Sequence, residues 1–576
     1  MNQLCSAQRR VNGESAGTSS NSLLDSLWES AARWPQKTAL VFCDQRTTYE
    51  ELTRQVELLA GALHGLGVER GDRVLLDMQN TPQLVIAHFA ILRANAVVVP
   101  VNPMNRRREL EHCICDAGAR VAIVTADLAR EMVEASDALP PSMRLKHLVV
   151  SGFRDSFDPT ATHPLSVTPA WLDWLLAEHS RPTLEGGEVH SWTELMSAAK
   201  CPPERLAGSA DMALLPYTSG TTGRPKGCVH HHRGLLHNAA ASKAWFGMTE
   251  QSVVLAAVPM FHITGIVAVM YAAITAGVTM VIMPRWDRDV AAHLILKWKV
   301  TSWISIPTMV VDIMASPQLK EYALGSLVSV GGGGAAMPQA VAQRLLEEFK
   351  LKYQEGYGLT ETAGPSHSNP AERPKQQCLG VPFIGVDARV VDPETLKEVT
   401  RGEPGEIVVH GPQVFQGYWN RPEASAAAFV QIEGKRFFRT GDIGRVDEEG
   451  YYFMTDRLKR MINASGFKVW PAEVELMMYR HPAIQEACVI ATRDAYRGES
   501  VKAVVVLRRT HLGTRPTEIA AWCRQEMAAY KVPREVVFVD ALPKSASGKV
   551  LWRQLQEEEE ARQLGAGVES LAATQG

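Results

Sequence analysis

Residues 217–227 read YTSGTTGRPKG and contain three glycines, four serine or threonine hydroxyls and the cations Arg224 and Lys226. Glycine permits backbone conformations with φ > 0, and successive turn amides form a concavity that binds anions. The hydroxyls add donors and the cations add charge, so this composition predicts a phosphate-binding loop. A Walker A loop is excluded, because Pro225 precedes Lys226 where that motif requires glycine, and Gly227 follows where it requires serine or threonine.

A second glycine cluster, SLVSVGGGGAAMPQAVAQRLLEEF, follows a predicted strand and precedes a predicted helix. Residues 331–336 satisfy the dinucleotide fingerprint G-x-G-x-x-A, and Glu355 lies near the distance expected for a ribose-binding acid. A nicotinamide-dependent oxidoreductase is therefore one alternative. It is disfavoured because Met337-Pro338 interrupts the start of the helix and because it leaves the 217–227 loop unexplained. A turn that only packs a helix on a sheet would need about two glycines, not four.

The third cluster, YQEGYGLTET at residues 353–362, combines small residues with an aromatic face and side-chain oxygens. Tyr357 supplies the aromatic ring, and Thr360 and Glu361 supply the oxygens. A carboxylate beside phosphates commonly holds Mg²⁺, which takes a few protein oxygens together with phosphate and water. Taken alone, a solvated loop glutamate is the default interpretation.

Two further segments carry isolated charged residues. In FRTGDIGRVDEEGYYFMTDRLKR, Asp442 follows a glycine turn and Arg457 comes fifteen residues later. The pair could grip a sugar diol and a neighbouring phosphate, or either residue could form a surface salt bridge. In LPKSASGKVLWRQL, Lys549 stands in a loop rich in serine and glycine, where a lysine is usually a solvated charge.

Composition limits the class of protein. A chain of 576 residues is too long for one ordinary core, so two or more domains are expected. The net charge of −3 argues against a general nucleic-acid binder. Nine cysteines without zinc-ligand spacing indicate reduced thiols and a cytoplasmic protein. Residues 251–284 contain no charged side chain, but prolines, glycines and a histidine interrupt them, so buried strands and a core helix are favoured over a membrane span.

Alternating helical and strand-like patterns predict an α/β fold whose large N-terminal domain has layered α/β subdomains and a small β subdomain, followed by a mobile α+β C-terminal domain. The predicted boundaries are listed in chain order: a disordered leader at 1–22, the N-terminal domain at 23–457, an insertion or surface excursion at 151–200, the C-terminal domain at 458–556, and a frayed, then disordered, tail at 557–576. Within the excursion, WLDWLL is expected to pack on the body; weak peripheral membrane association is the alternative.

In their order and spacing these motifs resemble the adenylate-forming superfamily of acyl- and aryl-CoA synthetases, luciferases and peptide-synthetase adenylation domains. The resemblance extends from TTYEELTRQVELLAGAL, near residue 47, to SASGK at 545–549. It implies an enzyme that uses ATP and Mg²⁺ to convert a carboxylic acid to an acyl-adenylate and then transfers the acyl group to CoA. The family branch implied is the fatty-acid:CoA ligases, with lipid metabolism as the setting.

The resemblance also implies roles for individual residues. The β- and γ-phosphates would be held by the loop residues Thr218, Ser219, Gly220, Thr221, Thr222, Gly223 and Lys226. Adenine would lie between one short backbone stretch and an aromatic ring, formed by Gly333, Gly334 and Ala335 on one side and Tyr357 on the other.

The remaining nucleotide contacts follow from the same resemblance. Thr360 would bind the α-phosphate and Glu361 would hold Mg²⁺. Asp442 would accept both ribose hydroxyls with help from Arg457. Lys549 would bridge the substrate carboxylate and the α-phosphate, a role that suits a point charge on a long stem.

His262, in VPMFHITG, matches the family's gate beside the acyl carboxylate, although a core histidine bonded to a backbone carbonyl is the alternative. A hinge would fall on Lys459, and Gly466 would let the pantetheine arm pass. SGFKVWPAEVE is similar to the corresponding stretch of bacterial medium- and long-chain fatty acyl-CoA ligases, so a medium- or long-chain fatty acid is expected, with an aryl acid or a carrier-protein acceptor as alternatives. Ile266 stands where some long-chain members carry an aromatic gate, which argues against a gated long-chain tunnel and leaves medium-chain or aryl acids open.

Overall fold

The computed structural model describes residues 22–198, 201–218, 225–457, 460–464, 467–469, 471–494, 498–527, 529–544 and 550–573. The chain divides into two compact units. The first unit comprises Met1–Ala388 and Val409–Phe438, and the second comprises Arg389–Val408 and Arg439–Gly576. The predicted α/β class, with a large N-terminal part and a smaller C-terminal part, is confirmed. The second unit begins before the predicted boundary at 457/458, because residues 389–408 and 439–457 belong to it.

A nine-stranded sheet forms one half of the first unit, in the order β18-β17-β16-β15-β14-β12-β13-β1-β2. Its strands are β1 (Thr38–Phe42), β2 (Gln45–Thr48), β12 (Val253–Ala256), β13 (Thr279–Ile282), β14 (Ser302–Ser305), β15 (Ser329–Gly333), β16 (Tyr353–Leu359), β17 (Gly364–Ser368) and β18 (Val381–Pro382). The six central strands, β16, β15, β14, β12, β13 and β1, pair in parallel. At the edges, β2 pairs with β1, β17 with β16 and β18 with β17, all antiparallel. The glycine-rich 331–334 and YGLTET segments therefore stand at the ends of adjacent parallel strands.

A seven-stranded sheet, in the order β11-β8-β4-β3-β5-β6-β7, forms the other half. Its strands are β3 (Arg73–Asp77), β4 (Val97–Pro100), β5 (Val121–Thr125), β6 (His147–Ser151), β7 (Glu188–Ser191), β8 (Met212–Leu214) and β11 (His230–His231). Val74 and Leu76 enter the larger hydrophobic core, whereas Leu75 enters a smaller core on the opposite face. This alternation follows from the two-residue period of a strand, and burial on both faces explains the continuous apolar runs.

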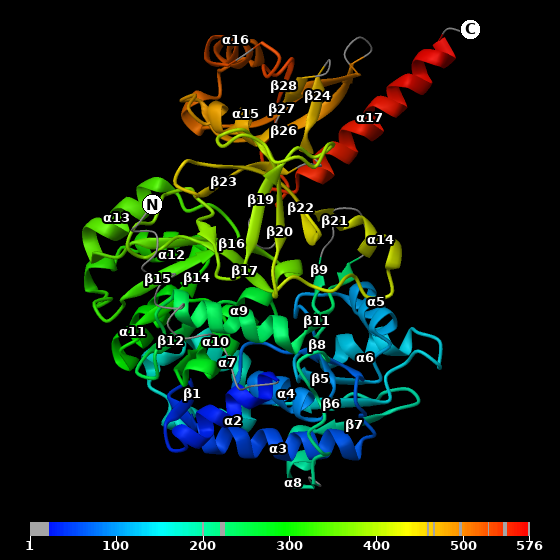
Figure 1. The fold of residues 1–576 in the computed structure, drawn as a ribbon, viewed down its shortest axis with the longest axis vertical. Helices are drawn as coiled ribbons and strands as arrows, with labels where there is room; N and C mark the ends of the chain where they lie inside the picture. The colour runs from blue at the N-terminus through cyan, green and yellow to red at the C-terminus, as the bar shows by residue number, and fades with distance from the viewer. Residues whose placement is uncertain are drawn as a thin grey trace. The chain divides into compact units, whose positions relative to one another are not determined.

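Helices connect and cover these strands (Figure 1). Among its described residues, the α-helices of the first unit are α2 (Leu23–Arg33), α3 (Tyr49–Gly65), α4 (Pro82–Arg93), α5 (Arg107–Ala117), α6 (Ala129–Asp137), α7 (Pro169–Leu176), α8 (Trp192–Ser197), α9 (His232–Trp245), α10 (Ala272–Ala276), α11 (Arg288–Trp298), α12 (Pro307–Met314), α13 (Gln339–Phe349) and α14 (Pro422–Ala427). Every residue of α4 is buried, as its apolar composition on all faces requires. Residues 1–21 lie outside the described residues, whereas Ser22, the last residue of the predicted leader, is the buried N-cap of α2.

The charge-free segment 251–284 is a set of core elements, as predicted. It contains β12, β13, α10 and the π-helix η4 (Gly265–Tyr271), all seven residues of which are buried. Gly277, at φ +68°, ends α10 in the left-handed conformation. Among the described residues, no helix combines the length and the low charge content needed to cross a bilayer.

Residues 151–200, expected to be an insertion or surface excursion, contribute to the sheet itself. β7 pairs in parallel with β6 and is the edge strand of the seven-stranded sheet. Trp171 and Trp192 are buried in the larger core, and the Trp174 indole donates to Asp127 Oδ2 at 3.0 Å. The WLDWLL helix therefore packs on the body of the first unit, and a surface excursion describes only part of this segment.

Two smaller sheets have five strands each. The first has the order β19-β20-β22-β21, with β23 beside β22. Its strands are β19 (Asp387–Val391), β20 (Gly405–His410), β21 (Phe429–Ile432), β22 (Lys435–Val446) and β23 (Tyr452–Arg457). The C-terminal elements are β24 (Ile462–Ala464), β25 (Phe467–Val469), α15 (Pro471–Met478), β26 (Ile484–Asp494), β27 (Gly498–Leu507), α16 (Pro516–Glu526), β28 (Glu535–Phe538) and α17 (Trp552–Ala573).

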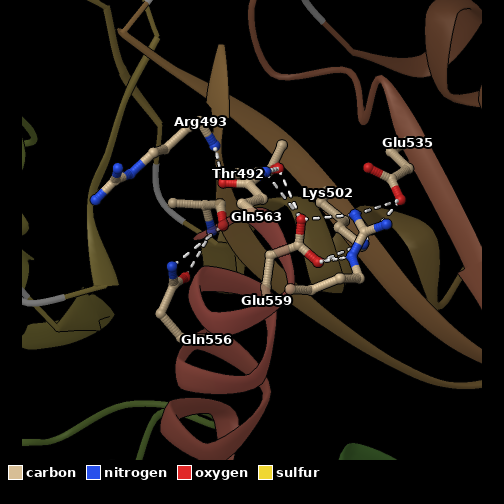
Figure 2. A network of polar contacts seen from close by, with 9 residues as sticks. Thr492, Arg493, Lys502, Glu535, Gln556, Glu559 and Gln563 are labelled. Atoms are coloured by element: carbon tan, nitrogen blue, oxygen red, sulfur yellow. Dashed lines mark hydrogen bonds and ion pairs between the residues drawn. The ribbon is translucent and has the colours of Figure 1, made fainter. Parts of the chain in front are cut away.

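A frayed tail was predicted from residue 557 onward, but the first turns of α17 are held by contacts with β26 and β27. Figure 2 shows Glu559 of this helix between Lys502 and Thr492. The Lys502 ammonium lies 2.7 Å from a Glu559 oxygen, and the two side chains are only 7% and 4% exposed. Arg562 adds a contact to Glu559 at 2.9 Å. A buried cation on β27 thus anchors a glutamate of the EEEE run, which by local composition reads as a solvated surface.

Replacing Glu559 with Gln should destabilise the second unit by about 1–3 kcal/mol at neutral pH, because Lys502 loses one of its two carboxylate partners. Burial opposes ionisation of Glu559, but hydrogen bonds from Arg562, Lys502 and Thr492 outweigh it and lower its pKa from 4.5 to about 2. A depressed pKa contributes stability above the unfolded-state value and loses it as the pH falls from 4.5 toward 2.

Denaturant unfolding of the wild type and of Glu559→Gln at pH 7 and pH 3 measures this difference. The difference in the free energy of unfolding between the two proteins should be smaller at pH 3 than at pH 7. Glu557→Gln, a change at an exposed position two residues earlier, is the matched control and should alter stability by less than about 0.5 kcal/mol. The buried ion pair would be contradicted if this difference in the free energy of unfolding were the same at pH 3 and pH 7, or if both variants changed stability equally.

Candidate active site

The base of the predicted phosphate loop is a short antiparallel ladder in the first unit. β9 (Tyr217–Thr218) pairs with β10 (Lys226–Gly227), and Thr218 stands opposite Lys226. The Tyr217 hydroxyl donates to Asp116 Oδ2 at 2.9 Å and ties the ladder to the end of α5. The ends of the loop are therefore held together, as a phosphate-enclosing turn requires. The other predicted phosphate-binding residues lie outside the described residues: Ser219, Gly220, Thr221, Thr222 and Gly223.

Residues 415–419, FQGYW, join this ladder to the YGLTET segment. Tyr418 forms an antiparallel bridge with Cys228, and the Trp419 amide donates to the Gly227 carbonyl at 2.8 Å. At the other end of the segment, the Phe415 amide donates to the Glu361 carbonyl at 2.8 Å. Backbone hydrogen bonds thus bring Lys226 and Glu361 to the same place, although 135 positions separate them in the numbering of the chain.

Tyr418 connects the two motifs through its side chain as well. Its hydroxyl donates to Glu361 Oε1 at 2.8 Å, and the Lys226 ammonium lies 4.9 Å from the centre of its ring. Burial raises the pKa of Tyr418 above its ordinary value, and the Glu361 charge raises it further. The hydroxyl therefore stays protonated and donates to the carboxylate, while the ring face attracts the lysine.

The Thr360 backbone is held from behind by a histidine. His230 Nε2 donates to the Thr360 carbonyl at 2.8 Å, so the proton of its ring is on Nε2. Burial lowers the pKa of His230 to about 4, so the imidazole is neutral at neutral pH. His232 Nδ1 accepts the Leu23 amide at 3.2 Å. These contacts give His230 and His232 structural roles.

Backbone packing explains most of the glycine run. A Cβ on Gly331, Gly332 or Gly333 would lie 2.7, 1.8 or 2.3 Å from a neighbouring carbonyl oxygen, closer than real Cβ atoms approach. Gly334 differs, because it adopts φ +86° and faces open space. The close packing of β15 between β14 and β16 therefore requires three of the glycines independently of any ligand.

The predicted adenine-binding residues follow this packed stretch. Gly334 and Ala335 are exposed, whereas Tyr357 is 8% exposed and its ring lies 5.6 Å from that of His367. Glu355, the proposed ribose acid of the oxidoreductase alternative, is buried and accepts the amides of Met337 and Gln377 at 3.1 and 2.7 Å. Its carboxylate thus pins the loop after the glycines, a structural role that removes it from ribose binding.

His262 stands on an exposed turn beside the YGLTET segment. Asn80 supports this turn, because its side chain accepts the Met260 amide at 2.7 Å and donates to the Val258 carbonyl at 3.0 Å. A Cβ on Gly364 would lie 3.6 Å from the Ile263 carbonyl, so the residues after His262 pack against the end of that segment. His262 is exposed, which excludes the alternative of a buried core histidine.

The residues predicted for the ribose and for the second half-reaction belong to the second unit. Asp442 on β22 stands directly opposite Arg457 on β23, and the Asp442 side chain is buried. The two residues are fifteen positions apart in the chain because the connection between two antiparallel strands separates them, and they are cross-strand neighbours in the sheet. The predicted hinge Lys459 and the predicted functional residues Gly466 and Lys549 lie outside the described residues.

Comparison with known proteins identifies the family to which this chain belongs. A family model described as AMP-binding enzyme matches residues 27–419, and a model described as AMP-binding enzyme C-terminal domain matches residues 473–549. The chain belongs to the AMP-binding enzyme family. The predicted superfamily is thereby confirmed, and the nicotinamide oxidoreductase alternative is set aside together with its glycine fingerprint.

Individual relatives of this AMP-binding enzyme cover almost its whole length. A long-chain-fatty-acid–CoA ligase of Bacillus subtilis (strain 168) is 36% identical over 547 residues, which span 92% of this chain and 94% of the ligase. A feruloyl-CoA synthase of Amycolatopsis sp is 34% identical over 523 residues, 90% of this chain and 95% of the synthase. The crystal structure of ATP-bound MatB from Rhodopseudomonas palustris matches with a TM-score of 0.76 at 28% identity, over 94% of this chain and 99% of MatB.

Sequence reasoning missed Tyr418, Asp116 and His230 as parts of this site. Asp116 also accepts from Arg421 at 2.6 Å, so it fastens the 415–419 segment beside the loop ladder. The sequence signal for Tyr418 is only an aromatic residue in the loop-like stretch FQGYWN, which does not indicate a partner. These residues position the predicted ones through contacts between segments that are distant in the chain.

Tyr418→Phe should weaken magnesium-dependent ATP binding by about 10-fold, because a hydrogen bond to a charged group contributes about 1.5 kcal/mol. Calorimetric titration with ATP in MgCl₂ and in EDTA measures the effect. The loss is expected only with magnesium, because the hydroxyl's partner, Glu361, is the residue predicted to hold the ion. Tyr322→Phe, which removes a hydroxyl near Ser316 and Asp289, is the control and should bind like the wild type. Equal losses with and without magnesium would show a merely structural role for Tyr418.

Proposed function

We propose that this AMP-binding enzyme is an ATP-dependent acyl-CoA synthetase, an AMP-forming acid–thiol ligase that acts on a medium- or long-chain fatty acid. The observation that carries the proposal is the Tyr418–Glu361 hydrogen bond, which joins the phosphate-loop ladder to YGLTET in a single site. The 36% identity to a protein named long-chain-fatty-acid–CoA ligase supports the choice of acid. Cytoplasmic localisation remains a prediction from the sequence.

In the first half-reaction a carboxylate oxygen attacks the α-phosphorus of ATP, and pyrophosphate leaves. Two anions must approach each other, so donors and cations have to neutralise the developing charge. Thr218, Lys226 and the intervening loop would hold the departing phosphates, and Thr360 would bind the α-phosphate. Lys549 would bridge both reacting groups.

The residues at the site suit a magnesium ion. Mg²⁺ takes one or two protein carboxylates and completes its shell with phosphate and water oxygens, and Glu361 is a carboxylate oriented by Tyr418 at the base of the phosphate loop. When bound, the ion would neutralise part of the triphosphate charge. Tyr418 keeps the Glu361 carboxylate oriented, and the neutral His230 keeps the Thr360 backbone in place.

In the second half-reaction the CoA thiol, as thiolate, attacks the acyl carbonyl carbon, and AMP leaves with the electron pair of the broken mixed-anhydride bond. Gly466 would let the pantetheine arm pass, because a residue without a side chain permits close backbone approach. Lys459 would be the hinge that exchanges Lys549 for Gly466 between the steps. One chain would thereby provide two sets of groups in turn.

The proposed binding region for the acid consists of parts of residues 259–266, 307–308, 331–333 and 362–366. None of these ranges contains Lys, Arg, Asp or Glu. Ile263 and Ile266 belong to the larger hydrophobic core, and Pro307 is buried. A hydrophobic acyl tail fits such a lining, since nothing there would compensate a distal charge.

An aryl acid is the second candidate, favoured by the 34% identity to a protein named feruloyl-CoA synthase and by Ile266 in place of an aromatic gate. AMP formation from a panel of acids, acetate to palmitate with benzoate and ferulate, separates the two. For fatty acids, kcat/KM should rise up to about fourfold per added methylene until the pocket is full, as about 0.8 kcal/mol per buried CH₂ requires. Ferulate or benzoate ranking first would favour the aryl acid instead.

The CoA requirement is checked in the same panel. With an active acid, omission of CoA should reduce AMP release to a slow background, since the adenylate then stays on the enzyme. AMP release that CoA does not increase would point to a carrier-protein acceptor, and undiminished AMP release without CoA would point to simple hydrolysis of the adenylate. No ATP–pyrophosphate exchange with any acid would overturn the proposed function.

Lys549→Ala and Gly466→Leu should fail at different half-reactions. Lys549→Ala should cost about 3 kcal/mol or more in adenylate formation, yet still convert supplied acyl-AMP to thioester. Gly466→Leu should form adenylate and lose the thioester step. ATP–pyrophosphate exchange and thioester formation from synthetic acyl-AMP measure the two steps separately.

Lys544→Ala is the matched control for the charge, because Lys544 lies close to Lys549 in the chain and pairs with Glu486 at 2.7 Å. It should retain both activities. If Lys549→Ala and Gly466→Leu lose the same half-reaction, the two-step assignment is wrong.

A further inference from the structure

Three side chains with metal-binding atoms meet at the edge of the seven-stranded sheet, on strands that the proposed reaction does not use. β6 and β7 are parallel neighbours (Figure 1), and His147 stands opposite Glu188 in their register. Paired residues of adjacent strands point to the same face, and so do residues two apart on one strand. His147, Glu188 and His190 therefore share one face because of the backbone register itself.

The side-chain atoms are spaced as metal ligands are. His147 Nδ1 lies 3.1 Å from His190 Nε2, and His190 Nε2 lies 3.6 Å from Glu188 Oε2. All three ligand atoms lie within 4.8 Å of one another. Zinc binds such atoms at about 2.0–2.2 Å, which places tetrahedral ligand atoms about 3.4 Å apart. Small side-chain adjustments would thus bring the three atoms into one coordination sphere.

The charge state of the cluster also suits a metal. Two imidazole nitrogens 3.1 Å apart cannot both carry a proton toward each other, so at least one of them presents a lone pair. The His190 side chain is 18% exposed and that of Glu188 is 73% exposed, so the carboxylate can turn toward the rings at little cost. Two neutral imidazoles and one carboxylate form a ligand set that zinc uses in proteins.

An ion can reach the cluster from outside. His147 lines a surface cavity of about 210 Å³ together with Lys146, Val74 and Val121. A metal site with three protein ligands keeps a fourth position for water, and the exposed Glu188 leaves that position accessible.

We propose that His147, Glu188 and His190 bind Zn²⁺ and fasten the edge strand β7 to β6. Residues 152–187 separate the two strands in the chain, and closing such a loop costs conformational entropy. A metal that links His147 to Glu188 and His190 offsets part of this cost and adds to the ladder of hydrogen bonds between β6 and β7. The site is independent of the nucleotide and the acid.

Equilibrium dialysis of the full-length, EDTA-treated protein against ZnCl₂, with metal quantified per chain, tests this proposal. The wild type should bind one zinc ion more than His190→Gln and Glu188→Gln at the same free zinc. Other thiol or histidine sites cancel in that difference. His179→Gln is the matched control, since His179 is an exposed histidine in the same excursion, and it should bind as much zinc as the wild type.

Thermal unfolding supplies a second measurement that does not depend on enzyme activity. Zinc should raise the Tm of the wild type by roughly 2 °C or more beyond that of His190→Gln, because the ion binds the folded site. MgCl₂ should not reproduce the shift, since magnesium prefers an all-oxygen octahedral shell. Equal zinc stoichiometry in the wild type and in both variants would overturn the proposal, as would equal zinc-induced shifts in Tm.

Discussion

The hydrogen bond from Tyr418 to Glu361, with the backbone ladder around it, is the contact on which the candidate active site depends. It joins three segments of the chain: residues 226–229, which follow the phosphate loop, the YGLTET turn, and residues 415–419. A glycine-rich loop has high conformational freedom, so its charges can act together with Glu361 only if its ends are held. The ladder holds those ends, and the partly buried Tyr418 hydroxyl orients the Glu361 carboxylate.

The glycine run shows how one short motif can serve packing and chemistry together. Gly331, Gly332 and Gly333 are required by the approach of β14 and β16, and Gly334 is required by its own left-handed conformation. Glu355 then secures the following loop through two amides. A sequence fingerprint that counts glycines cannot separate these causes, which is why the dinucleotide pattern also fitted. The family match and the occupied Glu355 carboxylate decide between the two interpretations.

Two segments that look peripheral in the sequence are parts of the fold. The predicted excursion 151–200 contains β7, an edge strand of the seven-stranded sheet, and the acidic run of α17 places Glu559 against the buried Lys502. Both expectations rested on local composition, and in both cases a distant partner overrides it. A charge run reads as solvated because isolated charges are costly to bury, but a paired charge within a hydrogen-bonded network is not isolated.

The family and the α/β class could be predicted from the sequence alone, and the residues expected at the nucleotide are predictions of the same kind, because all these signals are local. The 217–227 loop and YGLTET are runs of consecutive residues, and strands and helices leave periods of two and 3.6 in the chain. The residues that hold these motifs in place became known from the tertiary structure. Tyr418 and Glu361 are 57 positions apart, as are Lys502 and Glu559. A contact between such distant positions depends on how the sheets and helices pack, and neither local pattern contains that information.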